Sequence, residues 1–239
     1  AGYLTAAIFL AGLSAWYLLK QRHVELARRS FRMAVLFGVL ATAGVITLGG
    51  ALGFVGGQAQ PTKLAAMEGL WKSEPAPMPF NLVAFPSQQQ QTNHGTVQVP
   101  YVLSLLVTHS LTGSVPGFDQ LEQQAATRIR DGIPAVAALQ TLSAKPGDAD
   151  ALAQFRAHQQ DLGYGFLVQR YAPDVTKATD AQIATAARDA IPQVAPVFWS
   201  FRIMVALGLA MLAYFVLAVI YTMRNRVERK RWFLKLAVW

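Results

Sequence analysis

Two residues near the first quarter of the chain, Lys63 and Glu68, have side chains suited to proton transfer. They lie in Pro61-Thr-Lys-Leu-Ala-Ala-Met-Glu-Gly-Leu-Trp71, where a proline at the first helical position favours a short helix. At about 100° per residue the two side chains lie about 140° apart, so they do not form an i, i+4 pair but could line adjacent edges of one pocket. A redox reaction that removes protons needs a carboxylate acceptor and a donor that holds the oxygen. Two ordinary solvated charges are the alternative interpretation.

A second candidate pair, Arg202 and Met204, lies in Phe198-Trp-Ser-Phe-Arg-Ile-Met204. An arginine in or near a membrane costs about 2–3 kcal/mol on insertion scales and usually has a partner or a role. A thioether sulfur can be an axial haem ligand. One interpretation is that Arg202 meets an anionic cofactor group while Met204 ligates a metal. A snorkelling arginine and a packing methionine are the alternatives.

Three apolar runs must position these residues. No charged side chain occurs from Ala1 to Leu19, between Arg32 and Lys63, or between Arg202 and Arg224. Each run meets or approaches the length of about 20 residues that a helix needs to cross a bilayer. The sequence therefore predicts membrane helices over about 2–19, 33–55 and 196–223.

The net charge of +8 is unevenly distributed along the chain. Residues 58–195 hold 9 Lys and Arg against 11 Asp and Glu, a net charge of −2, and the remainder carries +10. Short basic loops beside membrane helices face the cytoplasm, so the clusters at 20–32 and 224–231 are predicted to be cytoplasmic and 58–195 to lie outside. Such clusters favour anionic lipid head groups, and the segregation of charge argues against a nucleic-acid binder.

The composition excludes several other classes of protein. With 53% hydrophobic residues and no cysteine, the chain is not a disordered protein, a disulfide scaffold or a thiolate metal protein. The phosphate-loop, His-Glu-x-x-His and nucleophile-elbow motifs are absent from the sequence, and its four histidines are scattered. A membrane enzyme and a non-enzymatic transporter or receptor with an outer sensory domain both remain open.

The predicted fold class is all-α, a multi-spanning membrane helical bundle with a large, mainly helical extramembrane loop domain. The predicted domains are 1–57, with two membrane helices and a cytoplasmic basic loop, 58–195 as the outer domain, and 196–239. The chain starts without a methionine and stops inside an apolar run, so it is expected to be an interior piece of a longer protein.

Within the outer domain, three helices are expected. They are near 118–142, broken around Gly132 and Pro134; near 149–170, interrupted by Gly163 and Gly165; and near 181–190, with a capping box that starts at Thr179. The polar segment 88–93 is predicted to be mobile, and 97–111 to be a buried or interfacial segment.

The segments that contain Lys63, Glu68, Arg202 and Met204 resemble subunit I of the cytochrome bd quinol oxidases. Other matching pieces are Gly12-Leu-Ser-Ala-Trp-Tyr-Leu-Leu-Lys20, Gln98-Val-Pro-Tyr101, Asp161-Leu-Gly-Tyr-Gly-Phe-Leu-Val-Gln-Arg-Tyr171 and Arg224-Asn-Arg226. The resemblance covers nearly the whole chain. It implies that the middle segment is a quinol-oxidising loop of the long type, on the periplasmic side of a bacterial inner membrane.

The resemblance also implies roles for the four residues. Lys63 would hydrogen-bond the quinol oxygen and Glu68 would accept a proton and release it outward. Met204 would be an axial ligand of a low-spin haem b, with Arg202 two residues before it, and the electron would pass to that haem.

Several parts are implied to lie outside this sequence. One is an axial histidine just upstream of Ala1. The others belong to the oxygen site, whose haems are of b and d type: its glutamates and its glycine–arginine–glutamine–proline–tryptophan motif. The implied partners are membrane quinol, a second oxidase subunit, small accessory subunits and the lipid bilayer. This piece alone is therefore expected to be unable to reduce oxygen.

Overall fold

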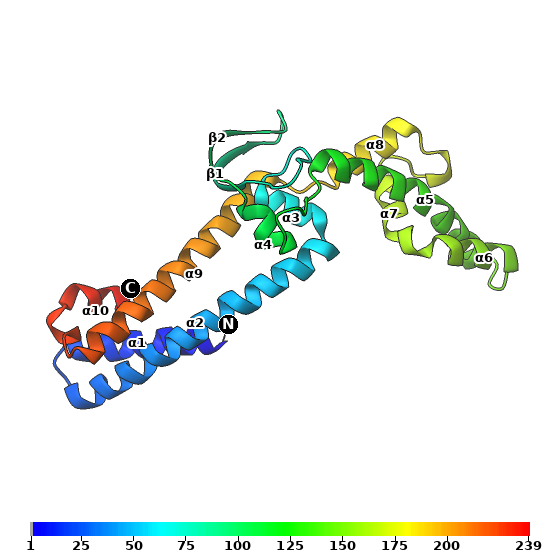
Figure 1. The fold of residues 1–239 in the computed structure, drawn as a ribbon. Helices are drawn as coiled ribbons and strands as arrows, with labels where there is room; N and C mark the ends of the chain where they lie inside the picture. The colour runs from blue at the N-terminus through cyan, green and yellow to red at the C-terminus, as the bar shows by residue number, and fades with distance from the viewer. Residues whose placement is uncertain (1) are drawn as a thin grey trace. The chain divides into compact units, whose positions relative to one another are not determined.

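The computed structural model describes residues 2–239 (Figure 1). The chain divides into two compact units, residues 1–53 with 201–239 and residues 54–200. We refer to them as the span unit and the loop unit.

The elements are mostly helical. The helices are α1 (Gly2–Leu19), α2 (Val24–Ala59), α3 (Pro61–Glu68), α4 (Val102–Thr108), α5 (Phe118–Ala144), α6 (Ala149–His158), α7 (Leu162–Leu167), α8 (Asp180–Asp189), α9 (Val194–Met223) and α10 (Arg231–Val238). Two strands, β1 (Phe80–Ser87) and β2 (Thr92–Val99), form an antiparallel hairpin. Short 3-10 turns are η1 (Gln159–Asp161), η2 (Val168–Arg170), η3 (Val175–Lys177) and η4 (Val227–Arg229).

Within residues 2–239, three helical segments are long and apolar enough to cross a membrane, judged by length and composition: α1, α2 and the segment that contains α9. The predicted fold class, a mainly helical protein with membrane-length helices, is confirmed. The second apolar helix is longer than predicted, because α2 begins at Val24 and includes the basic residues that precede the apolar run.

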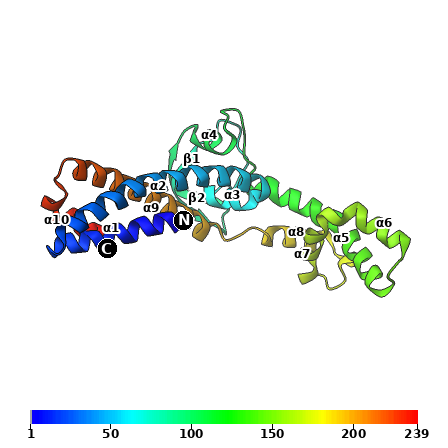
Figure 2. The same cartoon turned by 90° about the horizontal axis from the view of Figure 1, so that it is seen from below.

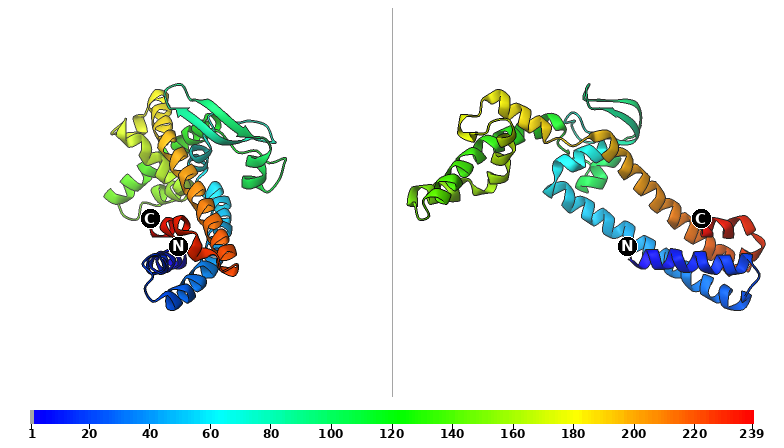
Figure 3. Two further views of the ribbon diagram at one scale, coloured as in Figure 1. Left: turned by 90° about the vertical axis from the view of Figure 1, so that its left-hand side faces the viewer. Right: turned by 180° about the vertical axis from the view of Figure 1, so that it is seen from behind.

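The span unit is held together by small residues on α1 and aromatic residues on the other helices. Ala7, Ala11 and Ala15 recur every four residues and are buried, which lets another backbone approach α1 closely. A Cβ added at Gly12 would lie 2.8 Å from the carbonyl oxygen of Ala237, so α1 and α10 meet at this point (Figure 3). The larger core side chains include Leu18, Phe31, Val35, Phe215 and Phe233.

The loop unit has two hydrophobic clusters. The first surrounds α3 and the start of α5, and its buried members include Ala65, Ala66, Trp71, Met78, Leu103 and Phe118. The second joins α5 to the segments that follow it, which gather around it in Figure 2, and includes Ile129, Val136, Val168 and Ile183.

Two of the glycines that were expected to break helices, Gly132 and Gly165, are packing positions instead. Helix α5 runs through Gly132 and Pro134 without interruption. A Cβ on Gly132 would lie 2.1 Å from the carbonyl oxygen of Asp161, and one on Gly165 would lie 2.5 Å from that of Gly132. The second predicted helix does break, but at the 3-10 turn η1, so both Gly163 and Gly165 lie inside α7.

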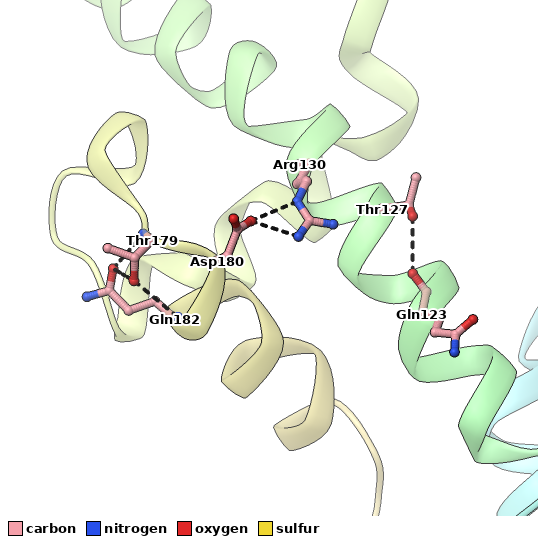
Figure 4. A network of polar contacts seen from close by, with 6 residues as sticks. All are labelled: Gln123, Thr127, Arg130, Thr179, Asp180 and Gln182. Atoms are coloured by element: carbon pink, nitrogen blue, oxygen red, sulfur yellow. Dashed lines mark hydrogen bonds and ion pairs between the residues drawn. The ribbon is translucent and has the colours of Figure 1, made fainter.

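The third predicted helix is confirmed with its cap. In α8, the hydroxyl of Thr179 accepts from the backbone N–H of Gln182, and the Gln182 side chain accepts from the backbone N–H of Thr179. Beside this cap, Arg130 of α5 donates to the carboxylate of Asp180 over 2.8 Å, which ties α8 to α5 (Figure 4).

The hairpin was missed by the sequence analysis. Segment 88–93 supplies its turn and the start of β2, and 97–111 is divided between the end of β2 and helix α4. The alternation that normally identifies a strand is weak here, because β2 is exposed along nearly its whole length.

Candidate functional site

Helix α3 forms because its sequence fixes both ends. Pro61 occupies the first turn, where its missing N–H costs no hydrogen bond. Gly69 ends the helix with a left-handed φ of 65°, and its N–H points at the carbonyl oxygens of Ala65 and Ala66. The predicted short helix is therefore confirmed, and it starts only two residues after α2 ends at Ala59.

The two candidate residues on α3 differ in environment. Lys63 is exposed, whereas Glu68 is buried, with 3% of its surface accessible. They are separated by five residues, which places them about 140° apart around the helix and about 7.5 Å apart along it. A solvated glutamate, the alternative reading of Glu68, is contradicted by this burial.

The hairpin holds the end of α3 through two asparagines. Asn81 of β1 is buried, and its side-chain amide donates to the carbonyl oxygen of Glu68 over 2.9 Å. Gln98, its partner across the hairpin, donates to the Asn81 carbonyl oxygen over 2.9 Å. The backbone of Glu68 is therefore fixed by a chain of amides from both strands.

Asn93 of β2 fixes the next residue. Its side-chain amide donates to the carbonyl oxygen of Gly69 over 2.8 Å, and its own carbonyl oxygen accepts from the indole N–H of Trp71 over 2.9 Å. These contacts satisfy backbone groups that a helix end leaves without intrahelical partners. The sequence analysis missed Asn81 and Asn93; the only sequence signal was the matching segment that begins at Gln98.

A hollow of about 300 Å³ lies at the other end of α3, between Pro61, Thr62 and helices α5, α7 and α8. Arg128 is at its wall, paired with Asp161 at 2.6 Å and placed over the ring of Tyr164 at 4.1 Å. The hydrogen bond that Arg128 donates to the Asp161 carboxylate raises the pKa of Arg128 above its already high ordinary value. Neither Lys63 nor Glu68 lines this hollow, so it is separate from the candidate pair.

Arg202 and Met204 both lie on α9, but on different sides of it. Positions two apart on a helix are separated by about 200° and do not face each other. Consistent with this, Arg202 is buried, with 8% of its surface accessible, and Met204 is 60% exposed. The Arg202 guanidinium lies 5.4 Å from the centre of the Phe201 ring.

The donor chemistry of α9 fits a haem. The exposed thioether of Met204 is accessible to an iron from outside the helix, and thioethers serve as axial haem ligands. In residues 2–239, no group of three or more His, Cys, Asp or Glu side chains could hold a metal ion, so a metal site of that kind is not found in the described part.

Comparisons with known proteins give a consistent result. The model of the family "Cytochrome bd terminal oxidase subunit I" matches residues 1–239. The chain is 46% identical over 239 residues to cytochrome bd-II ubiquinol oxidase subunit 1 of Escherichia coli (strain K12), covering 100% of this chain and 46% of that protein. It is 27% identical over 234 residues to cytochrome bd ubiquinol oxidase subunit 1 of Bacillus subtilis (strain 168), covering 98% of this chain and 38% of that protein.

Among solved structures, the bd oxidase from Geobacillus thermodenitrificans is similar at a TM-score of 0.45 and 16% identity, over 93% of this chain and 55% of that one. That similarity is too low to carry an argument. The chain spans less than half the length of the two relatives above. Because the family model matches all 239 residues, the chain belongs to the cytochrome bd terminal oxidase subunit I family.

Proposed function

We propose that this chain is the quinol-oxidising portion of a terminal respiratory oxidase, which passes electrons from membrane quinol toward the reduction of oxygen to water. Membership of the family supports this proposal, as do the names of the two relatives, both ubiquinol oxidase subunits. The activity belongs to the complete complex.

The observation that carries the proposal is the buried carboxylate of Glu68 at the end of α3. Burying a carboxylate is costly, so buried carboxylates are concentrated at functional sites. The start of α3 two residues after the membrane-length helix α2 supports access of a lipid-soluble quinol to this carboxylate.

Lys63 and Glu68 have different roles in quinol oxidation. The exposed ammonium of Lys63 donates a hydrogen bond to a quinol oxygen, and the Glu68 carboxylate accepts the proton that leaves as the quinol is oxidised. Glu68 then releases the proton to the outer side.

On α9, Met204 and Arg202 would hold a low-spin haem b, Met204 through its thioether sulfur and Arg202 through the haem's anionic groups. When bound, this haem would supply a one-electron acceptor for quinol oxidation. The 60% exposure of Met204 leaves the thioether free for such a bond.

The charge distribution along the sequence supports a membrane topology for the chain. The basic segments at 20–32 and 224–231 would face the cytoplasm of a bacterium, and residues 58–195 the periplasm. Protons released there would add to the membrane potential. The second oxidase subunit, small accessory subunits and the bilayer would complete the assembly.

The test is oxygen consumption by the full-length oxidase with a short-chain quinol. Glu68→Gln keeps the size of the side chain but removes the proton acceptor, so turnover is expected to fall at least tenfold while haem absorption is unchanged. Glu68→Ala should behave in the same way. Glu74→Gln, at an exposed glutamate six residues later, is the matched control and should keep parental turnover.

Parental turnover in Glu68→Gln would remove Glu68 from the mechanism. The alternative function, a non-enzymatic transporter or receptor, predicts no haem and no quinone dependence. A visible absorption spectrum of the purified full-length protein distinguishes the two.

A further inference from the structure

The first half of the loop unit contains a long stretch without charge. From Pro75 to Phe118 there is no Lys, Arg, Asp or Glu, whereas 119–195 holds sixteen. A surface segment of a water-exposed domain would normally carry charges at about a quarter of its positions. The environment of this stretch therefore differs from that of the α5–α8 region.

Within this stretch, α4 and the residues after it expose three leucines. Leu105, Leu106 and Leu111 have 53%, 57% and 55% of their surfaces accessible. We call these three the leucine patch. Leu103 and Ser104 of the same helix are buried, and Leu103 is fully enclosed in the cluster around α3.

The polar side chains of α4 are satisfied internally. The buried hydroxyl of Ser104 donates to the carbonyl oxygen of Gly113 over 2.8 Å and accepts from the backbone N–H of Met78 over 2.8 Å. The hydroxyl of Thr108 is 2.7 Å from the carbonyl oxygen of Ser104. Polar groups next to hydrocarbon must be hydrogen-bonded within the protein, and the hydroxyls of Ser104 and Thr108 meet this requirement.

The position of α4 relative to α2 sets its depth. His109, directly after α4, stacks on Phe54 of α2 with ring centres 4.9 Å apart and planes 19° apart. Phe54 lies 21 residues after Met33, the start of the apolar part of α2, which is about 32 Å along a helix. The hydrocarbon core of a bilayer is about 30 Å thick, so Phe54 lies at its far boundary.

We propose that the leucine patch lies in the boundary between the lipid head groups and acyl chains, so that α4 anchors the loop unit to the membrane surface. The partner is phospholipid. Val55, next to Phe54, is also exposed, with 59% of its surface accessible. An apolar helical face held at this depth, with charges absent around it, is typical of an interfacial segment.

The experiment uses spin labels on the full-length oxidase in liposomes of phosphatidylethanolamine and phosphatidylglycerol. The chain has no cysteine, so Leu106→Cys gives a single label in it once cysteines elsewhere in the complex are replaced. Gln89→Cys, at the exposed hairpin turn, is the control. Collisions with oxygen, which concentrates in lipid, are compared with those of a water-soluble nickel chelate.

The label at 106 is expected to collide several-fold more with oxygen than with the chelate, and the label at 89 to show the opposite ratio. A chelate-dominated signal at 106 would mean that the patch lies in water. A label at 106 that is immobilised and shielded from both reagents would mean that protein covers it. Either result overturns the proposal. Parental quinol oxidation in each variant verifies folding, and Leu111→Cys replaces Leu106→Cys if that variant does not assemble.

Discussion

The side-chain amide of Asn81 donates to the backbone carbonyl oxygen of Glu68, so a strand of the hairpin fixes the residue that bears the buried carboxylate. The side-chain amide of Asn93, on the other strand, donates to the backbone carbonyl oxygen of Gly69. The hairpin is thus the element that orients the end of α3, although neither strand supplies a side chain to the proposed chemistry.

Loss of this support should loosen α3. Asn93→Ala removes two hydrogen bonds and leaves the mostly buried indole N–H of Trp71 without its acceptor, a cost of about 1–3 kcal/mol. Hydrogen exchange of the 61–71 backbone should accelerate, and quinol turnover should fall while haem absorption is unchanged. Gln90→Ala is the matched control, because the Gln90 side chain lies in the same hairpin and is hydrogen-bonded to the exposed His94 over 2.8 Å, away from α3. Unchanged exchange in Asn93→Ala would contradict the supporting role.

Lys63 should contribute to quinol binding more than to proton removal. In Lys63→Ala, the apparent KM for a short-chain quinol is expected to rise about tenfold, which corresponds to a lost hydrogen bond of about 1.4 kcal/mol. Steady-state oxygen consumption measures this change. Lys72→Ala, at another exposed lysine of the loop unit, should leave KM at the parental value. An equal effect of both substitutions would reduce the role of Lys63 to general surface charge.

Met204 should be required for the low-spin haem. Leucine has nearly the same volume as methionine but has no sulfur, so Met204→Leu should abolish the parental low-spin signal in redox difference spectra while the subunit still assembles. Met223→Leu provides the comparison, since Met223 is on the same helix and is 73% exposed. If the spectrum of Met204→Leu matches the parent, the ligand assignment is wrong.

The contact between α5 and α7 should depend on Gly132. Its Cβ would clash with backbone atoms, which cannot rotate away, so Gly132→Ala should destabilise the contact by about 1–3 kcal/mol. Hydrogen exchange over 118–170 should rise. Gly163→Ala is the matched control. Nothing lies within 4 Å of a Cβ at that position, and alanine is a better helix former than glycine, so this variant should not raise the exchange. Similar exchange in the two variants would mean that the close approach does not occur.

Asp174 should make the η3 turn sensitive to acid. Hydrogen bonds from Thr176, followed by the contact with Lys177, hold the pKa of Asp174 below its ordinary value of 3.8. Because the folded pKa is lowered, the stabilisation is present above pH 3.8 and is lost as the pH falls through the lowered value. Hydrogen exchange of residues 174–178, corrected for the intrinsic rate, should rise in that range.

The Asp174→Asn variant should lack this acid transition. Asp150→Asn, in the first turn of α6, should retain it. A transition that persists in Asp174→Asn would assign the acid sensitivity to another group.

Much of the architecture was determined by the sequence, because it depends on local properties. Apolar runs of sufficient length predicted the membrane helices, Pro61 and Gly69 delimit α3, and Thr179 with Gln182 caps α8. Lys63, Glu68, Arg202 and Met204 were selected from residue type and resemblance, and their roles stay proposals.

The tertiary structure decided what each of these residues faces. Asn81 and Asn93 reach the end of α3 from a hairpin, and one of its strands, β2, is exposed and shows little alternation. Gly132 looked like a helix break, yet it is the point where another backbone packs against α5. Contacts between segments distant in sequence leave no periodic signal in either one, so only the folded chain shows which polar groups meet and which glycines make room.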